Sequence, residues 1–126
     1  MKKKILVIDD EEILTRTFSR LLEKRGYEVL VASRPDDALV MADEETFDLA
    51  LCDIRMPGTN GVETVRKIME ILDERGKTQL PVIFLTGFAD KKLEEEARSL
   101  RPVDYIFKPF DAVKLLELID STLKES

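Results

Sequence analysis

One stretch of the chain decides the fold, and it reads Leu49-Ala50-Leu51-Cys52-Asp53-Ile54-Arg55-Met56-Pro57-Gly58. Its four leading apolar residues are typical of a strand buried on both faces, as in a parallel sheet. The apolar run ends at Asp53, and the chain then turns at Pro57-Gly58. We therefore expect Asp53 to lie at the edge of a sheet and to carry the chemistry of the protein.

The composition predicts one domain over residues 1–126, large enough to bury a core. A formal net charge of −6 argues against direct binding of nucleic acid or of an anionic membrane. A single cysteine excludes an internal disulfide, the apolar run Ile5–Ile8 is too short for a signal peptide, and no segment reaches membrane-spanning length. These features predict a cytoplasmic protein.

The sequence contains no histidine. Histidine is the commonest general base and the commonest ligand of transition metals. Mechanisms that pair histidine with serine or cysteine are therefore excluded, which leaves carboxylates, hydroxyls, lysine and hard cations.

Strand and helix patterns alternate along the whole chain. The predicted strands cover residues 5–8, 27–32, 47–52, 81–85 and 103–107. Apolar residues at helical spacing predict helices over residues 14–22, 35–42, 62–72, 90–100 and 110–123. Parallel strands need helical crossovers, so the pattern predicts an α/β, flavodoxin-like three-layer sandwich with a five-stranded parallel sheet of order 2-1-3-4-5.

Polar residues stand at the predicted carboxyl ends of four strands. They are Asp9, Asp10, Asp53, Thr86 and Lys108. Each is ordinary by itself, since acids favour helix N-termini and Asp is common in turns. Because the carboxyl ends of parallel strands meet at one edge of a sheet, we expect these side chains to form one site.

Three converging carboxylates repel each other unless a cation lies between them. Oxygen ligands favour Mg²⁺ or Mn²⁺, and Mg²⁺ commonly takes a phosphate as a further ligand. Lys108 and Thr86 can contact phosphoryl oxygens, so Asp53 is predicted to be the nucleophile of a phosphoryl-transfer site. Pro109 after Lys108 makes a cis peptide bond in a tight turn plausible.

The set of motifs resembles the receiver domain of bacterial two-component response regulators. The matching motifs are Ile8-Asp9-Asp10-Glu11, Asp53-Ile54-Arg55-Met56-Pro57-Gly58 with Gly61, Leu85-Thr86-Gly87, and Asp104-Tyr105 before Lys108-Pro109-Phe110. The resemblance covers essentially the whole chain.

The resemblance implies a role for each site residue. Asp53 is expected to be the phosphoacceptor, and Lys108 the lysine that binds the phosphoryl group. Asp10 is expected to bind Mg²⁺ directly, with Asp9 beside it and the Arg55 backbone carbonyl as a main-chain ligand.

The resemblance also implies a switch. Phosphorylation would draw Thr86 toward the phosphoryl group, and Tyr105 would turn inward into the vacated space. The predicted helix 90–100 has a thin apolar stripe, so we expect it to move and to remodel the output face that it forms with the fifth strand and fifth helix. A fixed, half-buried Tyr105 is the alternative.

The phosphoryl donor is expected to be a histidine of another protein, either a sensor histidine kinase or a phosphotransfer protein. The protein would be no turnover enzyme, because it only phosphorylates itself and slowly loses its own phosphoryl group. The output would pass to an effector domain or protein, with a phosphorylation-dependent homodimer as an option. The chain is expected to be a stand-alone receiver or the amino-terminal domain of a longer regulator.

Two positions near Asp53 are predicted to tune the lifetime of the phosphoryl group. Arg55 lies two residues after Asp53, and Phe88 lies two residues after Thr86. A guanidinium can pair with phosphate and a phenyl ring can exclude water, so we expect slow self-hydrolysis.

Two departures from the family pattern concern regions outside the site. Arg101-Pro102 replaces a small Gly-Ala pair before the fifth strand, and Pro102 is expected to push Arg101 toward extended geometry. Residues Glu74 to Gln79 form a slightly long connection, which is expected to be neutral.

Three alternatives remain open at this point. A flavodoxin-like cofactor binder would need a phosphate loop where this chain has acids after the first strand. A magnesium-dependent phosphatase usually has a second Asp two residues after its nucleophile, where this chain has Arg55. A degenerate receiver that serves only as an interaction module would have no need of the complete set of acids, threonine and lysine.

Overall fold

The computed structural model describes residues 2–56, 58–87 and 89–124, and its main feature is a five-stranded parallel sheet. The strands are β1 (Lys4–Ile8), β2 (Glu28–Ala32), β3 (Leu49–Asp53), β6 (Val82–Thr86) and β7 (Asp104–Phe107). Their order is β2-β1-β3-β6-β7. Since β6 and β7 are the fourth and fifth strands of this sheet along the chain, the predicted order 2-1-3-4-5 is confirmed.

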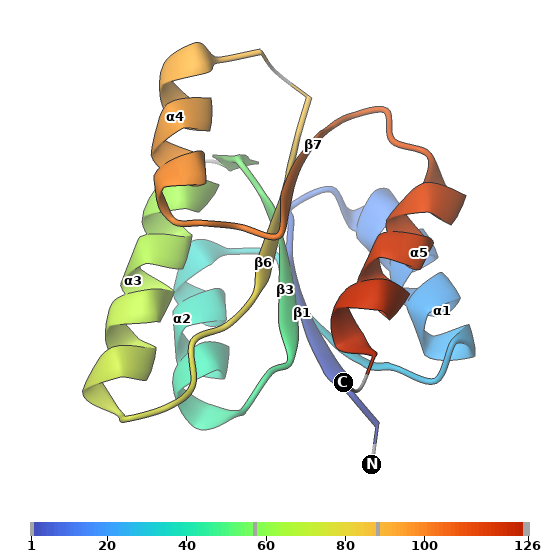
Figure 1. Ribbon diagram of the computed structural model, residues 1–126, viewed down its shortest axis with the longest axis horizontal. Coiled ribbons are helices and arrows are strands. Elements are labelled where there is room, and N and C mark those ends of the chain that lie inside the picture. The colour runs from blue at the N-terminus through green and yellow to red at the C-terminus, as the bar shows by residue number, and fades with distance from the viewer. Residues whose placement is uncertain (1, 57, 88, 125–126) are drawn as a thin grey trace.

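Helices cover both faces of the sheet. They are α1 (Glu12–Lys24), α2 (Pro35–Glu44), α3 (Gly61–Glu74), α4 (Lys91–Ser99) and α5 (Ala112–Leu123). Figure 1 shows α2, α3 and α4 on one side of the strands and α1 and α5 on the other. The predicted three-layer sandwich is therefore confirmed, and all parallel strands point toward one edge of the sheet, which we call the carboxyl edge.

Alternation along the strands divides the core into two layers. In β1, Leu6 and Ile8 pack on the side of α2 and α3, whereas Ile5 and Val7 pack on the side of α1 and α5. Every residue of β3 and β6 is buried, as expected for strands with helices on both faces. This rigid centre fixes the positions from which the polar side chains of the carboxyl edge project.

Side-chain caps fix where three of the helices begin. Asn60, Asp90 and Asp111 precede α3, α4 and α5, and each accepts a hydrogen bond from a backbone N–H in the first turn. Beyond the other end of α1, Gly26 has a φ of 93°, the left-handed conformation in which glycine commonly ends a helix. These caps set where the loops of the carboxyl edge end.

A short hairpin after β3 differs from the simple turn that the sequence predicts. Strands β4 (Arg55–Met56) and β5 (Thr59–Asn60) pair in an antiparallel ladder. Strands of two residues are too short to show an alternation of apolar and polar residues, so the sequence indicates only the turn between them. The hairpin carries the chain from Asp53 to the start of α3.

The prediction for Arg101 is wrong. Its φ is 55°, in the left-handed region, and its backbone N–H donates to the Arg98 carbonyl at 3.0 Å. The position just after a helix commonly takes this conformation, because it closes the last turn. At the end of α4 this closure outweighs the preference for extended geometry before Pro102.

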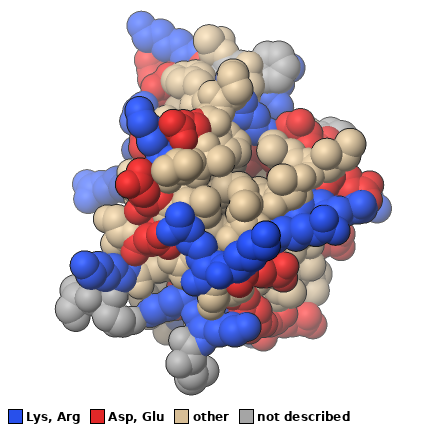
Figure 2. All heavy atoms as spheres, turned by 90° about the vertical axis from the view of Figure 1, so that its right-hand side faces the viewer, with Lys and Arg blue, Asp and Glu red and all other residues tan. Residues whose placement is uncertain are grey.

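The outer face made by α1 and α5 is mixed in charge. Figure 2 shows a band of Lys and Arg side chains across this face, with uncharged surface above it. Arg25, at the end of α1, pairs with Asp120 of α5, which also accepts a hydrogen bond from the Tyr27 hydroxyl. Within the described part of the chain, no helix is long and apolar enough to cross a membrane.

Candidate functional site

The carboxyl edge brings the predicted site residues together. Asp9 directly follows β1, Asp53 ends β3, Thr86 ends β6 and Lys108 directly follows β7. Backbone hydrogen bonds continue across this edge, and the Lys108 N–H donates to the Thr86 carbonyl at 2.7 Å. The loops are therefore held to the same frame as the strands.

Three carboxylates form the centre of the site. Oxygen atoms of Asp9, Asp10 and Asp53 all lie within 4.8 Å of one another. Asp9 is only 4% exposed and Asp53 only 5%, whereas Asp10 is exposed to solvent. The predicted convergence of the acids is confirmed, with two of them inside the protein and one at its surface.

Burial and repulsion make these acids hard to ionise. The pKa of Asp53 is raised to about 6, chiefly by burial and also by the nearby Asp9, while Lys108 and the Arg55 backbone N–H act in the opposite direction. Burial likewise raises the pKa of Asp9. The site therefore holds more negative charge than its own lysine neutralises, which favours a bound cation.

Lys108 lies among three carboxylates. Its Nζ atom is 3.3 Å from Asp9, 3.5 Å from Asp53 and 2.7 Å from Glu11. Burial lowers the pKa of Lys108, but these three acids together outweigh burial and raise it. The bond from Lys108 to Pro109 is cis, a geometry that the proline in the sequence allows.

Glu11 is the site residue that sequence reasoning missed. The sequence places Glu11 only in the motif Ile8-Asp9-Asp10-Glu11, whose two aspartates alone are assigned to the cation site. Glu11 nevertheless makes the shortest contact with Lys108, at 2.7 Å. The signal was available, because Glu11 directly follows two acids of the same sheet edge to which the sequence also assigns Lys108.

The two predicted switch residues are both buried. Thr86 is 1% exposed, and Tyr105 is 5% exposed with its ring turned inward. The ring lies against Phe84 and Phe107, and the Arg98 guanidinium of α4 lies 5.4 Å from the ring centroid. Tyr105 thus occupies the inward position that the switch hypothesis assigns to the phosphorylated protein.

Burial also leaves the Tyr105 hydroxyl poorly satisfied. Among the described residues it has no hydrogen-bond partner of ordinary geometry, although Thr86 lies near enough to act on its pKa. Burial is the main reason why the pKa of Tyr105 is raised. A buried hydroxyl in this condition costs free energy, so the inward position depends on the ring contacts.

The two predicted lifetime residues lie differently. Arg55 begins β4 with its side chain exposed, and its backbone N–H donates to Asp53 Oδ1 at 3.4 Å. It shares a hollow of the surface with Asp90 and Leu93 of α4. Phe88 lies outside the described residues, so its predicted shielding role stays a prediction.

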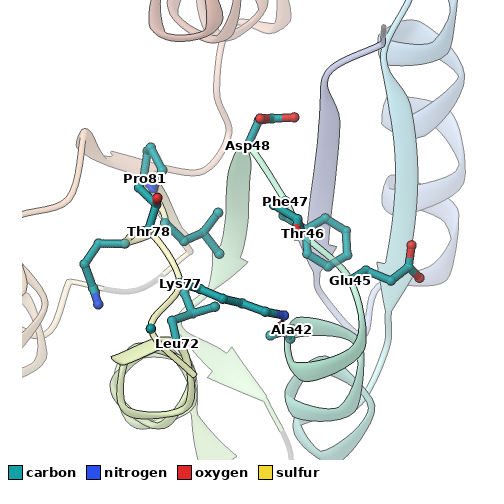
Figure 3. Close-up of a pocket in the computed structure, with 12 residues that line it drawn as sticks. Ala42, Glu45, Thr46, Phe47, Asp48, Leu72, Lys77, Thr78 and Pro81 are labelled. Atoms are coloured by element: carbon teal, nitrogen blue, oxygen red, sulfur yellow. Dashed lines mark hydrogen bonds between the residues drawn. The ribbon is translucent and has the colours of Figure 1, made fainter. Parts of the chain in front are cut away.

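The opposite edge of the sheet, which we call the amino edge, holds a cavity of about 530 Å³. Figure 3 shows Lys77 reaching from the end of α3 toward the end of α2 beside this cavity. Its ammonium donates to the Asp43 carbonyl at 2.9 Å, so it caps the last turn of α2. None of the predicted site residues that the structure describes lines this cavity. The slightly long connection after Glu74 lies here, away from the acids.

Sequence comparison identifies relatives along nearly the whole chain. The model of the response regulator receiver domain matches residues 5–120. The transcriptional regulatory protein ZraR of Salmonella typhimurium is 33% identical over 94% of this chain, and ResD of Bacillus subtilis is 32% identical over 98%. The chain spans 26% of the former and 49% of the latter, so it corresponds to part of each.

Solved structures agree with this assignment. A CheY-like receiver domain protein from Methanospirillum hungatei is 30% identical, with a TM-score of 0.87 and full coverage of both chains. A response regulator from Burkholderia pseudomallei, solved with a phosphorylated aspartic acid, a calcium ion and citrate, is 28% identical with a TM-score of 0.80, over 93% of this chain and 66% of that one. The fold described above agrees with these matches, and the chain belongs to the family of response regulator receiver domains.

Proposed function

We propose that Asp53 accepts a phosphoryl group from a phosphohistidine of a sensor histidine kinase or phosphotransfer protein in the cytoplasm. The observation that carries this proposal is a buried carboxylate at the end of β3, with two further acids within 4.8 Å and the Lys108 ammonium at 3.5 Å. Buried carboxylates with raised pKa values are typical of functional sites. A relative with a phosphorylated aspartic acid supports the same chemistry.

The donor set fits Mg²⁺, with Mn²⁺ as a second option. Asp9, Asp10 and Asp53 offer only oxygen ligands, and their mutual repulsion is relieved when a divalent cation binds. The Arg55 carbonyl is proposed as a fourth protein ligand. The cation supplies charge neutralisation for the phosphoryl oxygens.

The remaining chemistry belongs to residues of this chain. A carboxylate oxygen of Asp53 forms a bond to phosphorus as the P–N bond to the donor imidazole breaks, and the electron pair returns to the imidazole nitrogen. Lys108 and the Thr86 hydroxyl donate hydrogen bonds to the phosphoryl oxygens. The protein is modified in the reaction, so it acts as a substrate of its partner rather than as a turnover enzyme.

The output is proposed to pass through α4, β7 and α5. In α4 only Ala97 is fully buried, so the helix is weakly held to the core. Movement of Thr86 toward the phosphoryl group would change the contacts of Tyr105, which lies between the sheet and α4. An effector domain or protein would read this face, alone or through a phosphorylation-dependent homodimer.

The phosphoryl lifetime is proposed to depend on Arg55 and Phe88. The exposed Arg55 side chain can reach over the hairpin toward a phosphoryl group on Asp53 and pair with it. Phe88 would exclude water from the phosphorus. The decay rate of the phosphorylated protein should rise in Phe88→Ala, and an unchanged rate would contradict the shielding role.

Intact-mass spectrometry tests the function. The protein is incubated with acetyl phosphate and Mg²⁺, and we expect one added phosphoryl group that is absent when a chelator removes the cation. Asp53→Ala should abolish the mass increase, whereas Asp37→Ala, which removes an exposed carboxylate of α2, should keep it. A mass increase that survives in Asp53→Ala would contradict the proposal.

A further inference from the structure

Lys108 has a closer partner than the residue that it is expected to assist. Its ammonium lies 2.7 Å from Glu11 Oε1 but 3.5 Å from Asp53 Oδ2. The Lys108 side chain is 14% exposed and that of Glu11 is 57% exposed. The ion pair therefore lies at the mouth of the site, on the solvent side of Asp53.

The Glu11 carboxylate has no capping role. Glu11 is the N-cap residue of α1, yet its side chain makes no capping hydrogen bond. Its backbone N–H donates to Asp9 Oδ1 at 2.9 Å, an interaction that does not depend on the carboxylate. A change in the Glu11 side chain therefore acts chiefly on Lys108.

The contact with Glu11 competes with the use of Lys108 in phosphoryl transfer. A charge-assisted hydrogen bond to a phosphoryl oxygen requires an N to O distance of about 2.7–2.9 Å. Glu11 lies outside the cluster of Asp9, Asp10 and Asp53. When those three acids share a cation, their attraction for Lys108 falls and that of Glu11 does not.

We propose that Glu11 is a positioning residue that holds Lys108 back from Asp53 and thereby slows phosphorylation. This inference rests on the proposed function of Asp53. In the reaction with acetyl phosphate, the Asp53 oxygen bonds to phosphorus as the P–O bond to acetate breaks, and acetate leaves with the electron pair. Lys108 must release Glu11 to reach the oxygens of the group in transfer.

The variant Glu11→Gln tests this role with a matched control. It should raise the initial rate of phosphorylation by acetyl phosphate, at saturating Mg²⁺, by about two- to fivefold, the range of a partly exposed ion pair. Glu12→Gln removes the same charge from the next residue, where Glu12 pairs with Arg16 instead. We expect the control to leave the rate unchanged.

A Lys108→Ala background separates positioning from a general charge effect. There, the difference between Glu11→Gln and its parent should disappear, because the partner of Glu11 is gone. Equal effects of Glu11→Gln and Glu12→Gln, or a rate increase that persists without Lys108, would overturn the inference. If the unmodified protein takes up no phosphoryl group, the proposed function fails as well; if it does and Glu11→Gln has no effect, only this inference fails.

Discussion

At the amino edge of the sheet, Lys4 lies 2.7 Å from Glu45 and 3.7 Å from Glu28, and its backbone N–H donates to Asp48 at 2.7 Å. At the carboxyl edge, by contrast, Lys108 faces three acids and a fourth, Asp10, stands nearby. The amino edge places its charges in partly exposed pairs, whereas the carboxyl edge buries Asp9 and Asp53.

The polar groups of the amino edge stabilise the fold, whereas those of the carboxyl edge are available for function. The amino edge, with the cavity of Figure 3, uses its polar groups to close helix ends and strand starts. The carboxyl edge buries negative charge at a cost in folding free energy, and a cation or phosphoryl chemistry can use that charge. The predictions that follow ask whether the two edges respond differently to the same kind of change.

The largest expected effect comes from glycines at the two edges. A Cβ on Gly61 would lie 2.1 Å from the Asp53 backbone oxygen, whereas one on Gly76 would have no described atom within 4 Å. Gly61→Ala should therefore lower the free energy of unfolding by at least about 3 kcal/mol. The same change at Gly76, whose φ is 68°, should lower the free energy of unfolding by only about 1 kcal/mol.

Urea denaturation measures both variants. Gly87→Ala is the control, because Gly87 has no positive φ and a Cβ there would meet no described atom within 4 Å. Gly61→Ala should also impair phosphorylation, since it displaces the backbone of Asp53. If Gly61→Ala and Gly76→Ala lower the free energy of unfolding equally, the close contact between residue 61 and the Asp53 backbone would be contradicted.

Removal of one carboxylate should have opposite signs at the two edges. Asp53→Ala should raise the free energy of unfolding at neutral pH by about 2 kcal/mol, because it relieves a buried, repelled charge. Asp48→Ala should lower the free energy of unfolding by about 1 kcal/mol, because the Lys4 backbone N–H loses its acceptor. If both Asp53→Ala and Asp48→Ala lower the free energy of unfolding, the predicted contrast between the two edges would be contradicted.

The pH dependence of stability follows from the pKa of Asp53. Its value of about 6 in the folded protein lies above the ordinary 3.8, so the folded state binds the proton more tightly. Without divalent cations, the free energy of unfolding should rise as the pH falls from above 6 toward 4. Asp53→Ala should flatten this slope, and Mg²⁺ at neutral pH should stabilise the unmodified protein more than the variant.

The smallest expected effect concerns α4. Arg98→Ala removes the cation–π contact with Tyr105 and should cost about 0.5–1 kcal/mol. Arg66→Ala is the control, since Arg66 forms an ion pair with Glu63 on its own helix, as Arg98 does with Glu94. The Tyr105 ring resonances in NMR spectra should shift in the first variant only; no shift would mean that Arg98 does not hold the ring inward.

The fold could be predicted because its signals are local. Four apolar residues before Asp53 predicted a buried strand, and the alternation of such runs with helical periods left one sheet order. The edge site followed from the same logic, because parallel strands deliver their ends to one place. Residue type also allows the cis bond before Pro109 and favours the left-handed conformation of Gly26.

The features that escaped prediction depend on distances across the fold. Glu11 contacts Lys108 although 97 positions separate them in the sequence. Arg98 contacts the Tyr105 ring because of the way α4 packs against the sheet. The prediction of extended geometry at Arg101 was wrong, because closure of the last turn of α4 outweighed the effect of the following proline. Each of these cases is a competition between local preference and tertiary placement, and the sequence pattern shows only the first.

The central claim is that the charge excess at the carboxyl edge serves phosphoryl transfer to Asp53. The most direct test is phosphorus NMR of the protein with acetyl phosphate and Mg²⁺. We predict one protein-bound acyl phosphate signal that is lost in Asp53→Asn and kept in Asp48→Asn at the amino edge. A signal that persists in Asp53→Asn would contradict the account.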